Sequence, residues 1–108
     1  MAIRPYAWYA HEMAKVTFEW DAAKNSENFA KHGVTFEQAQ YAFTDPRRVI
    51  AQDLGHSTVE DRYFCFGEIE GAVLTVRFTY RANSIRIFGA GYWRKGKLIY
   101  EKQTDLHK

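Results

Sequence analysis

A histidine with carboxylates near it in the sequence lies in the stretch DLGHSTVEDR, residues 53–62. A histidine with a carboxylate nearby can do acid–base work near neutral pH, so His56, with Glu60 four residues later, could accept or donate a proton in catalysis. Asp53 and Arg62 flank the pair. A separation of four residues permits contact between His56 and Glu60 without requiring it. The stretch therefore predicts either an acid–base site or, as the alternative, a histidine hydrogen-bonded within a loop.

The sequence lacks the common signatures of metal and cofactor sites. Its four histidines are scattered and show neither HxH nor HExxH spacing, which a metal site built on one element would need. The GAG triplet at 89–91 has neither the spacing of a dinucleotide fingerprint nor that of a phosphate loop. Cys65 is the single cysteine, so it forms no internal disulfide and no CxxC pair. We expect neither a metal nor another cofactor.

The elements that must position these residues begin with a short strand and two helices. Alternating apolar and polar residues in VTFEW predict a strand over 16–20. Asp21 can cap the N-terminus of a helix that Gly33 would end in the left-handed conformation. Thr35 opens a second helix, with Gln38 three residues later in the capping-box arrangement. The short joint between the helices predicts a helical hairpin.

Four strand-like runs follow the helices, at 48–54, 62–69, 72–80 and 84–90. Two-residue turns at 70–71 and 82–83 would make the last three strands antiparallel and set their register. The cross-strand pairs are then Ile69 with Ala72, Cys65 with Val76, Tyr63 with Phe78, Tyr80 with Ile85 and Phe78 with Ile87. We expect an α+β fold of order β-α-α-β-β-β-β, an antiparallel sheet packed by the helical hairpin. In the basic C-terminal segment Gly96 weakens a helix, although residues 97–102 can form a short one.

The predicted register divides the sheet residues between two faces of different character. The core face carries Tyr63, Cys65, Gly67, Leu74, Val76, Phe78, Tyr80, Ile85 and Ile87, so Cys65 is expected to pack rather than react. The other face carries Arg62, Phe64, Phe66, Thr75, Arg77, Thr79, Arg86 and Phe88. Guanidinium groups bind phosphate and aromatic rings stack on unpaired bases, so this face suits single-stranded nucleic acid. The alternatives are that the basic C-terminal segment covers the phenylalanines, or that the face joins two copies of the chain.

The 108 residues are enough for one domain, and their charge is unevenly distributed. Residues 1–70 hold seven basic and eleven acidic residues (net −4), whereas residues 71–108 hold eight and two (net +6). A polyanion is therefore a candidate partner of the C-terminal third, unless the two parts neutralise each other. There is no apolar run of the roughly 18 residues that cross a bilayer, and no signal-peptide pattern. We expect a cytoplasmic protein whose domain spans 13–108, after an N-terminal extension of 1–12.

An ordered string of short motifs resembles the BrnT toxin family. The motifs are FEWDAAKN at 18–25, Asn28, KHGV at 31–34, Phe36-Glu37, Asp45-Pro46, Asp53, His56-Ser57, Glu60, Arg62, Arg81 and IRI at 85–87. They extend over about residues 16–101, and the ordered string is far more specific than any single motif. The resemblance implies a RelE-like α+β fold and the toxin role in a type II toxin–antitoxin system.

The resemblance also implies a ribonuclease that halts translation and is covered by a BrnA-like antitoxin. The expected partners are that antitoxin and RNA, which the ribosome could present, while DNA would be contacted only through the antitoxin. No membrane partner is expected. One departure stands out, because Gly91 occupies a position where such proteins commonly have an arginine. Arg94, Lys95 and Lys97 are the nearby cations that could replace it.

These implications lead to a hypothesis of metal-independent RNA cleavage, in which the ribose 2′-OH attacks the adjacent phosphate. The reaction needs a base, cations around the phosphorane and an acid for the 5′ oxygen. The candidates are His56 or Glu60 as base, Arg62, Arg81 and Arg86 around the phosphate, and Tyr92, Lys31 or His32 as acid or backbone contact. Further RNA-binding candidates are Lys24, Arg77, Arg94, Lys95 and Lys97. The alternative is a domain of the same fold that binds RNA or antitoxin without cleaving, which Gly91 favours.

Overall fold

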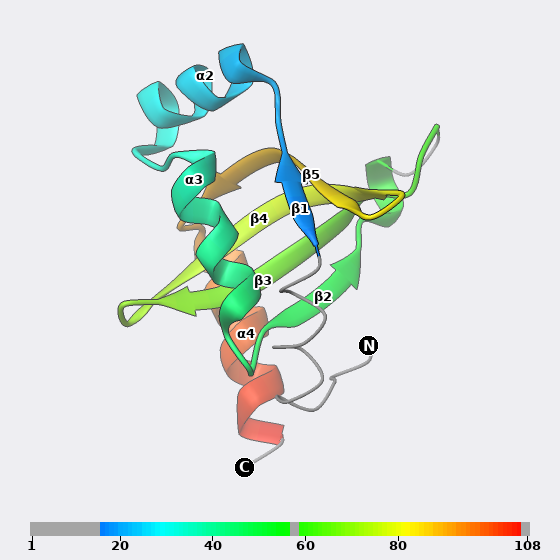
Figure 1. Ribbon diagram of the computed structural model, residues 1–108. Helices are drawn as coiled ribbons and strands as arrows, with labels where there is room; N and C mark the ends of the chain where they lie inside the picture. The colour runs from blue at the N-terminus through cyan, green and yellow to red at the C-terminus, as the bar shows by residue number, and fades with distance from the viewer. Residues whose placement is uncertain (1–15, 57–58, 107–108) are drawn as a thin grey trace.

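The computed structural model describes residues 16–56 and 59–106, so the expected extension of residues 1–12 lies outside the described residues, as does Ser57. The elements follow the predicted order (Figure 1). They are β1 Thr17–Glu19, α2 Ala22–His32, α3 Phe36–Ala39, the 3-10 helix η1 Gln40–Thr44, β2 Val49–Gln52, the 3-10 helix η2 Leu54–His56, β3 Tyr63–Ile69, β4 Ala72–Arg81, β5 Ser84–Gly91 and α4 Arg94–Leu106. Within the described residues, no helix is both long enough and apolar enough to cross a membrane.

The first two helices start as the sequence predicts. The side chain of Asp21 accepts hydrogen bonds from the first backbone N–H groups of α2, and Gly33 ends this helix in the left-handed conformation with φ of 70°. Thr35 and Gln38 form the capping box of α3. This helix makes only one turn before the chain tightens into η1. The predicted strand at 48–54 also proves shorter, because residues 54–56 form η2.

The five strands form one sheet in the order β1-β5-β4-β3-β2. The predicted register is confirmed along β3, β4 and β5, in all five of the cross-strand pairs given above. The prediction of an antiparallel sheet is wrong at one edge, because β1 pairs with β5 in parallel and the sheet is mixed. A tight hairpin forces neighbouring strands to be antiparallel. No such turn joins β1 to β5, since both helices and three strands lie between them in the chain.

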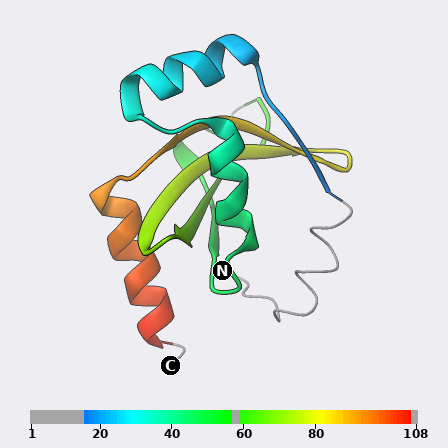
Figure 2. The same cartoon turned by 60° about the vertical axis from the view of Figure 1, so that its left-hand side comes forward.

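One face of the sheet is closed by α3 and η1, which cross it on the side opposite to α4 (Figure 2). The fully buried side chains on this side include Phe36 and Phe43 from the helices and Leu74, Val76 and Phe78 from β4. Tyr80 lies on the predicted face, with its ring centroid 5.1 Å from that of Phe78, but it is close to the turn at the end of β4 and is 53% exposed. One prediction for this face is wrong. Of the two helices in the predicted hairpin, α2 adds no apolar side chain to the core, and its one buried residue is Asn28.

The other face is partly covered by α4, which is much longer than the predicted helix at 97–102. Gly96 lies at the contact, where a Cβ would overlap Thr75 Oγ1 and come within 3.0 Å of the Phe66 ring. The glycine that weakens an isolated helix therefore lets this one approach the sheet closely. The hydroxyl of Tyr100 donates to Asp45 Oδ2 at 2.6 Å and ties the helix to the end of η1. One alternative from the sequence was that the basic C-terminal segment covers the phenylalanines of this face. The segment does cover Phe66, but only at one end of the face.

Candidate functional site

The uncovered part of this face adjoins a groove of about 300 Å³ beside α2 and the end of β5. We call it the α2–β5 groove, and its lining residues are Lys24, Glu27, Asn28, Lys31, His32, Arg62, Arg77, Phe88, Gly89 and Trp93. Four of these side chains are cationic and one is a carboxylate. A concave surface with this charge balance concentrates anions.

The buried side chain of Asn28 fixes α2 against β5. Its Nδ2 donates to the carbonyl oxygens of Val34 and Ala90, each at 2.9 Å, and its Oδ1 accepts from the backbone N–H of Ala90 at 3.1 Å. The strand β1 pairs with β5 only along residues 84–86. The Asn28 amide therefore satisfies the backbone of this edge at Ala90, beyond the part that β1 pairs with. Because Lys24 and Lys31 share this side of α2, both reach the groove.

A β-bulge places Phe88 in the groove. The register between β4 and β5 shifts so that Ile87 lies opposite Phe78 and Gly89 lies opposite Arg77, which leaves Phe88 without a partner. Two cations approach the Phe88 ring. The guanidinium carbon of Arg62 is 4.4 Å from the ring centroid and Lys24 Nζ is 5.7 Å from it. Both distances are within the range of cation–π attraction, so this ring gathers charges from two different elements.

The indole of Trp93 borders the groove and is 36% exposed. It meets the imidazole of His32 edge to face, with the ring centroids 5.2 Å apart. The indole also lies over Gly91, where a Cβ would be 2.6 Å from two carbon atoms of the ring. An arginine at position 91 would require the indole to move. The departure noted at Gly91 therefore has a steric reason in this chain.

Five of the predicted site residues come together in the α2–β5 groove: Lys24, Lys31, His32, Arg62 and Arg77. Glu60 lies at the margin of this group. Its carboxylate is 3.9 Å from the guanidinium of Arg62 and 3.6 Å from that of Arg81. These are partly exposed ion pairs of modest energy, which orient the two arginines more than they stabilise the fold.

Two other predicted residues lie outside the groove. Arg86 pairs with Glu19 of β1 at 3.6 Å. His56 is in η2, where its Nδ1 is 3.0 Å from Asp53 Oδ2 and its side chain is 64% exposed. The other Asp53 oxygen accepts from the backbone N–H of Gly55. This geometry matches the hydrogen-bonded loop that was the alternative to an acid–base role for His56.

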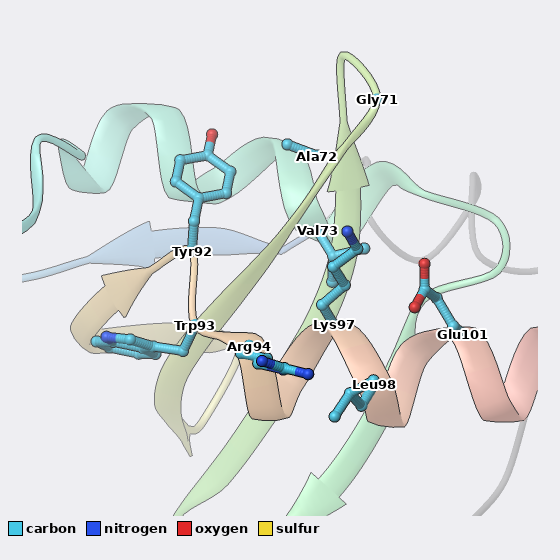
Figure 3. Close-up of a pocket in the computed structure, with 9 residues that line it drawn as sticks. All are labelled: Gly71, Ala72, Val73, Tyr92, Trp93, Arg94, Lys97, Leu98 and Glu101. Carbon is cyan, nitrogen blue, oxygen red and sulfur yellow. The ribbon is translucent and has the colours of Figure 1, made fainter.

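Three more predicted residues, Tyr92, Arg94 and Lys97, line a second groove of about 540 Å³ (Figure 3). We call it the β4–α4 groove, and its other lining residues are Gly71, Ala72, Val73, Trp93, Leu98 and Glu101. In Figure 3 the Lys97 side chain points toward Val73, whereas the indole of Trp93 points away from Lys97. The remaining predicted residue, Lys95, is exposed on α4 and lines neither of these grooves.

Cys65 is a packing residue, as its place on the predicted core face indicates. The side chain is fully buried, and Sγ is 3.8 Å from the carbonyl oxygen of Ala42. Burial raises the pKa of the Cys65 thiol far above its usual value. A thiol that stays protonated is a poor nucleophile. Among residues 16–56 and 59–106, no group of three or more His, Cys, Asp or Glu side chains could hold a metal ion.

Sequence reasoning missed Glu27 and the position of Trp93. A spacing signal existed for Glu27, which lies three residues after Lys24 and four before Lys31 and so shares their side of the helix. No comparable signal existed for Trp93. Its position depends on the bulge in β5 and on the residue at which α4 begins, and neither follows from hydrophobic periodicity.

Fold and groove together define a small α+β protein with one closed sheet face and a basic, aromatic-lined groove beside the other. The model of one protein family, the BrnT ribonuclease toxins of type II toxin–antitoxin systems, matches residues 20–96. The chain belongs to this family, and membership implies an antitoxin partner. The matched region contains every lining residue of the α2–β5 groove. A search of the curated proteins finds no match.

Proposed function

We propose that the α2–β5 groove binds single-stranded RNA and holds the phosphate at which this toxin cleaves. The observation that carries the proposal is the Phe88 ring with Arg62 and Lys24 against it. Arg77 and Lys31 line the same groove. Guanidinium groups can grip a phosphate with two parallel hydrogen bonds, and an aromatic ring offers a surface to an unpaired base.

The proposed reaction is a transesterification. The ribose 2′ oxygen bonds to phosphorus, the bond from phosphorus to the 5′ oxygen breaks, and the products carry a 2′,3′-cyclic phosphate and a 5′-hydroxyl. One group must take the 2′ proton and another must give a proton to the leaving oxygen. His32 and Glu27 line the groove and can exchange protons, while Arg62 and Arg77 offset the charge that develops on the phosphorane. Because these cations are protein side chains, the step as proposed requires no metal.

The other candidates from the sequence take supporting places in this proposal. Glu60 and Arg81 act through Arg62, whose guanidinium shares the Glu60 carboxylate with that of Arg81. In this proposal the RNA strand continues beyond the groove and is contacted there by Tyr92, Arg94 and Lys97. Lys95 adds to the positive field around the RNA. His56 and Arg86 stay predictions from the sequence. His56 contacts Asp53 and Arg86 contacts Glu19, and neither lines the groove, so the proposal gives them no role there.

Several expectations from the resemblance belong to the same proposal. The fold is RelE-like, the protein acts in the cytoplasm, and RNA cleavage stops translation, on free RNA or on RNA held by the ribosome. A BrnA-like antitoxin covers the toxin and makes the contacts to DNA. The charge balance of the groove supports this picture, because an acidic antitoxin segment and an RNA strand would compete for the same cations.

The test is cleavage of total cellular RNA by the purified protein in EDTA, with and without added ribosomes. We expect cleavage by the wild type and a loss of at least about 100-fold for Arg62→Ala/Arg77→Ala, as for removal of groups that stabilise transition-state charge. The control Arg47→Ala/Lys102→Ala removes two exposed cations outside the groove and should cleave normally. Equal activity of the two double variants would contradict the proposed site.

A further arm compares the sites that sequence and structure favour. Arg81→Ala/Arg86→Ala removes the same charge as Arg62→Ala/Arg77→Ala but leaves the lining of the groove intact. We expect it to retain more activity, because only Arg81 is linked to the groove, through Glu60. A complete loss in this variant alone would move the site to the sheet edge at β1.

A non-catalytic RNA-binding domain is the second candidate. The observation that favours it is the position of the Trp93 indole, which lies over Gly91. This ring occupies the space in which a cation at position 91 could have contacted the phosphate. The same proteins distinguish the two functions. RNA binding by the wild type without cleavage, with or without ribosomes, would support the binding domain.

A further inference from the structure

Trp93 lines both grooves and is the one residue that they share. Cations lie on both sides of it, Lys31 and Arg77 in the α2–β5 groove and Arg94 and Lys97 in the β4–α4 groove. None of these four forms any of the ion pairs found among residues 16–56 and 59–106. Each groove also holds one carboxylate, so cations outnumber carboxylates in both. A polyanion lying across Trp93 would thus meet positive charge before and after the ring.

The indole is held in place although it is exposed. Its ring packs over Gly91 and against the edge of His32. Its own backbone is held by the start of α4, where the carbonyl oxygen of Trp93 accepts from the N–H of Lys97 at 3.2 Å. An aromatic side chain fixed in this way loses little entropy when a flat ligand stacks on it, which is what a stacking surface needs.

We propose that Trp93 stacks on an unpaired base of an RNA strand that passes from the α2–β5 groove into the β4–α4 groove. The inference rests on the proposed function, because it takes RNA as the ligand of the first groove. It adds the direction in which the strand leaves that groove and the residue that orders the nucleotide next to the cleaved phosphate. The β4–α4 groove receives the following phosphate at Arg94 and Lys97, beside the exposed ring of Tyr92.

Stacking and charge contacts can be separated by the choice of RNA. The probe is a short fluorescein-labelled 2′-O-methyl oligoadenylate, which has no free 2′-OH and therefore cannot be cleaved by the proposed reaction. The comparison probe has the same length and backbone but abasic sites in its centre. Binding is measured by fluorescence anisotropy at several salt concentrations for the wild type, Trp93→Ala, Trp93→Phe, Lys97→Ala and Tyr41→Ala.

We expect Trp93→Ala to weaken binding of the oligoadenylate by roughly 5- to 150-fold, the range for loss of one base–aromatic stack. Binding of the abasic strand should change little, and Trp93→Phe should recover most of the loss. Lys97→Ala should weaken both probes and lower the salt dependence by about one phosphate contact. Tyr41 is 63% exposed on η1, on the opposite side of the sheet, so Tyr41→Ala should bind as the wild type does.

Each other outcome overturns a stated part. An equal loss for both probes in Trp93→Ala would make Trp93 a structural residue. Unchanged RNA binding in this variant, with loss of antitoxin capture, would assign the β4–α4 groove to the protein partner instead. If Trp93→Ala and Lys97→Ala both bind the two probes as the wild type does, the proposed path of the RNA strand is wrong, while the proposed function of the α2–β5 groove stands. If the wild type binds neither probe, the proposed function fails, and this inference fails with it.

Discussion

The two faces of the sheet are made by the same strands but are completed in different ways. On the face that α3 and η1 cover, which we call the closed face, Phe36, Phe43 and Phe78 are fully buried. On the opposite, open face, α4 covers Phe66 at one end, while Phe88 is left in contact with the cations of Arg62 and Lys24.

The difference separates stability from binding. Burial of apolar surface holds the closed face together. The open face depends on a few directed contacts, such as the Asn28 amide on β5 and the Tyr100 hydroxyl on Asp45. Substitutions on the closed face should therefore reduce stability, whereas those on the open face should reduce RNA binding more than stability.

The largest expected effect is that of Phe43→Ala on the closed face. Its ring lies 5.3 Å from the Phe18 ring and 5.0 Å from the Phe78 ring, between centroids. Truncation leaves a cavity that costs about 3–5 kcal/mol of the free energy of unfolding. Urea denaturation followed by circular dichroism measures this loss. The control Tyr41→Ala, two residues earlier and exposed, should change stability by less than about 0.5 kcal/mol.

Asn28→Ala tests the junction between α2 and the open face. The substitution leaves three backbone groups of Val34 and Ala90 without this partner. At about 1 kcal/mol or more for each group, the free energy of unfolding should fall by about 3 kcal/mol. RNA binding should fall further than in Phe43→Ala at equal folded fraction, because α2 carries Lys24 and Lys31. Ser26→Ala, at an exposed position of the same helix, should have little effect, and loss of stability without loss of binding would contradict the role assigned to Asn28.

Tyr100→Phe tests how α4 is held on the open face. Loss of the hydrogen bond to the Asp45 carboxylate should cost about 2 kcal/mol, the range for bonds to charged groups. Burial, and then the hydrogen bond to Asp45, raise the pKa of Tyr100 above its usual value of 10.0. The folded state therefore holds this proton more tightly than the unfolded state does.

The sign of the pH dependence follows from that shift. The stability linked to protonated Tyr100 is fully present below about pH 10 and is lost as the pH rises above it. Cys65, whose thiol pKa is also raised, from 9.0, adds a loss in the same direction. Denaturation at about pH 8 and pH 11 should show a smaller loss in Tyr100→Phe than in the wild type. Equal losses in the two proteins would mean that the shift in Tyr100 has no part in stability.

The closed face could be predicted from the sequence because its signals are local. Turns at 70–71 and 82–83 set the register, and alternating side chains then place Cys65, Val76 and Phe78 inside. The helix caps at Asp21 and Thr35 were predictable for the same reason, since a cap is made within three residues of chain.

The open face could be predicted only in part, because its contacts join distant segments. The parallel pairing of β1 with β5 and the reach of Asn28 to Ala90 both span more than 60 residues. In the sequence, Gly96 indicates a weak helix, whereas in the structure it permits a long one. A residue without a Cβ is a weak helix former, but it is also what the close contact between α4 and the sheet requires. The sequence therefore predicted all four cations that line the α2–β5 groove but neither Glu27 nor the bulge that brings Phe88 to them.

The smallest expected change in stability belongs to Gly91→Ala, which sharpens the comparison between the two faces most. The added Cβ would lie 2.6 Å from two ring carbons of Trp93, so the partly exposed indole has to give up the position in which Gly91 and His32 hold it. The free energy of unfolding should fall by about 1 kcal/mol, the low end for an added methyl group that meets a neighbour, because the indole lies at the surface. The indole, however, leaves its place over residue 91 and its edge-to-face contact with His32. We therefore expect shifted His32 ring resonances in nuclear magnetic resonance spectra and weaker binding of oligoadenylate, with binding of the abasic strand retained. A stability loss as large as that of Phe43→Ala would contradict this, because it would show that the open face is packed as tightly as the closed one.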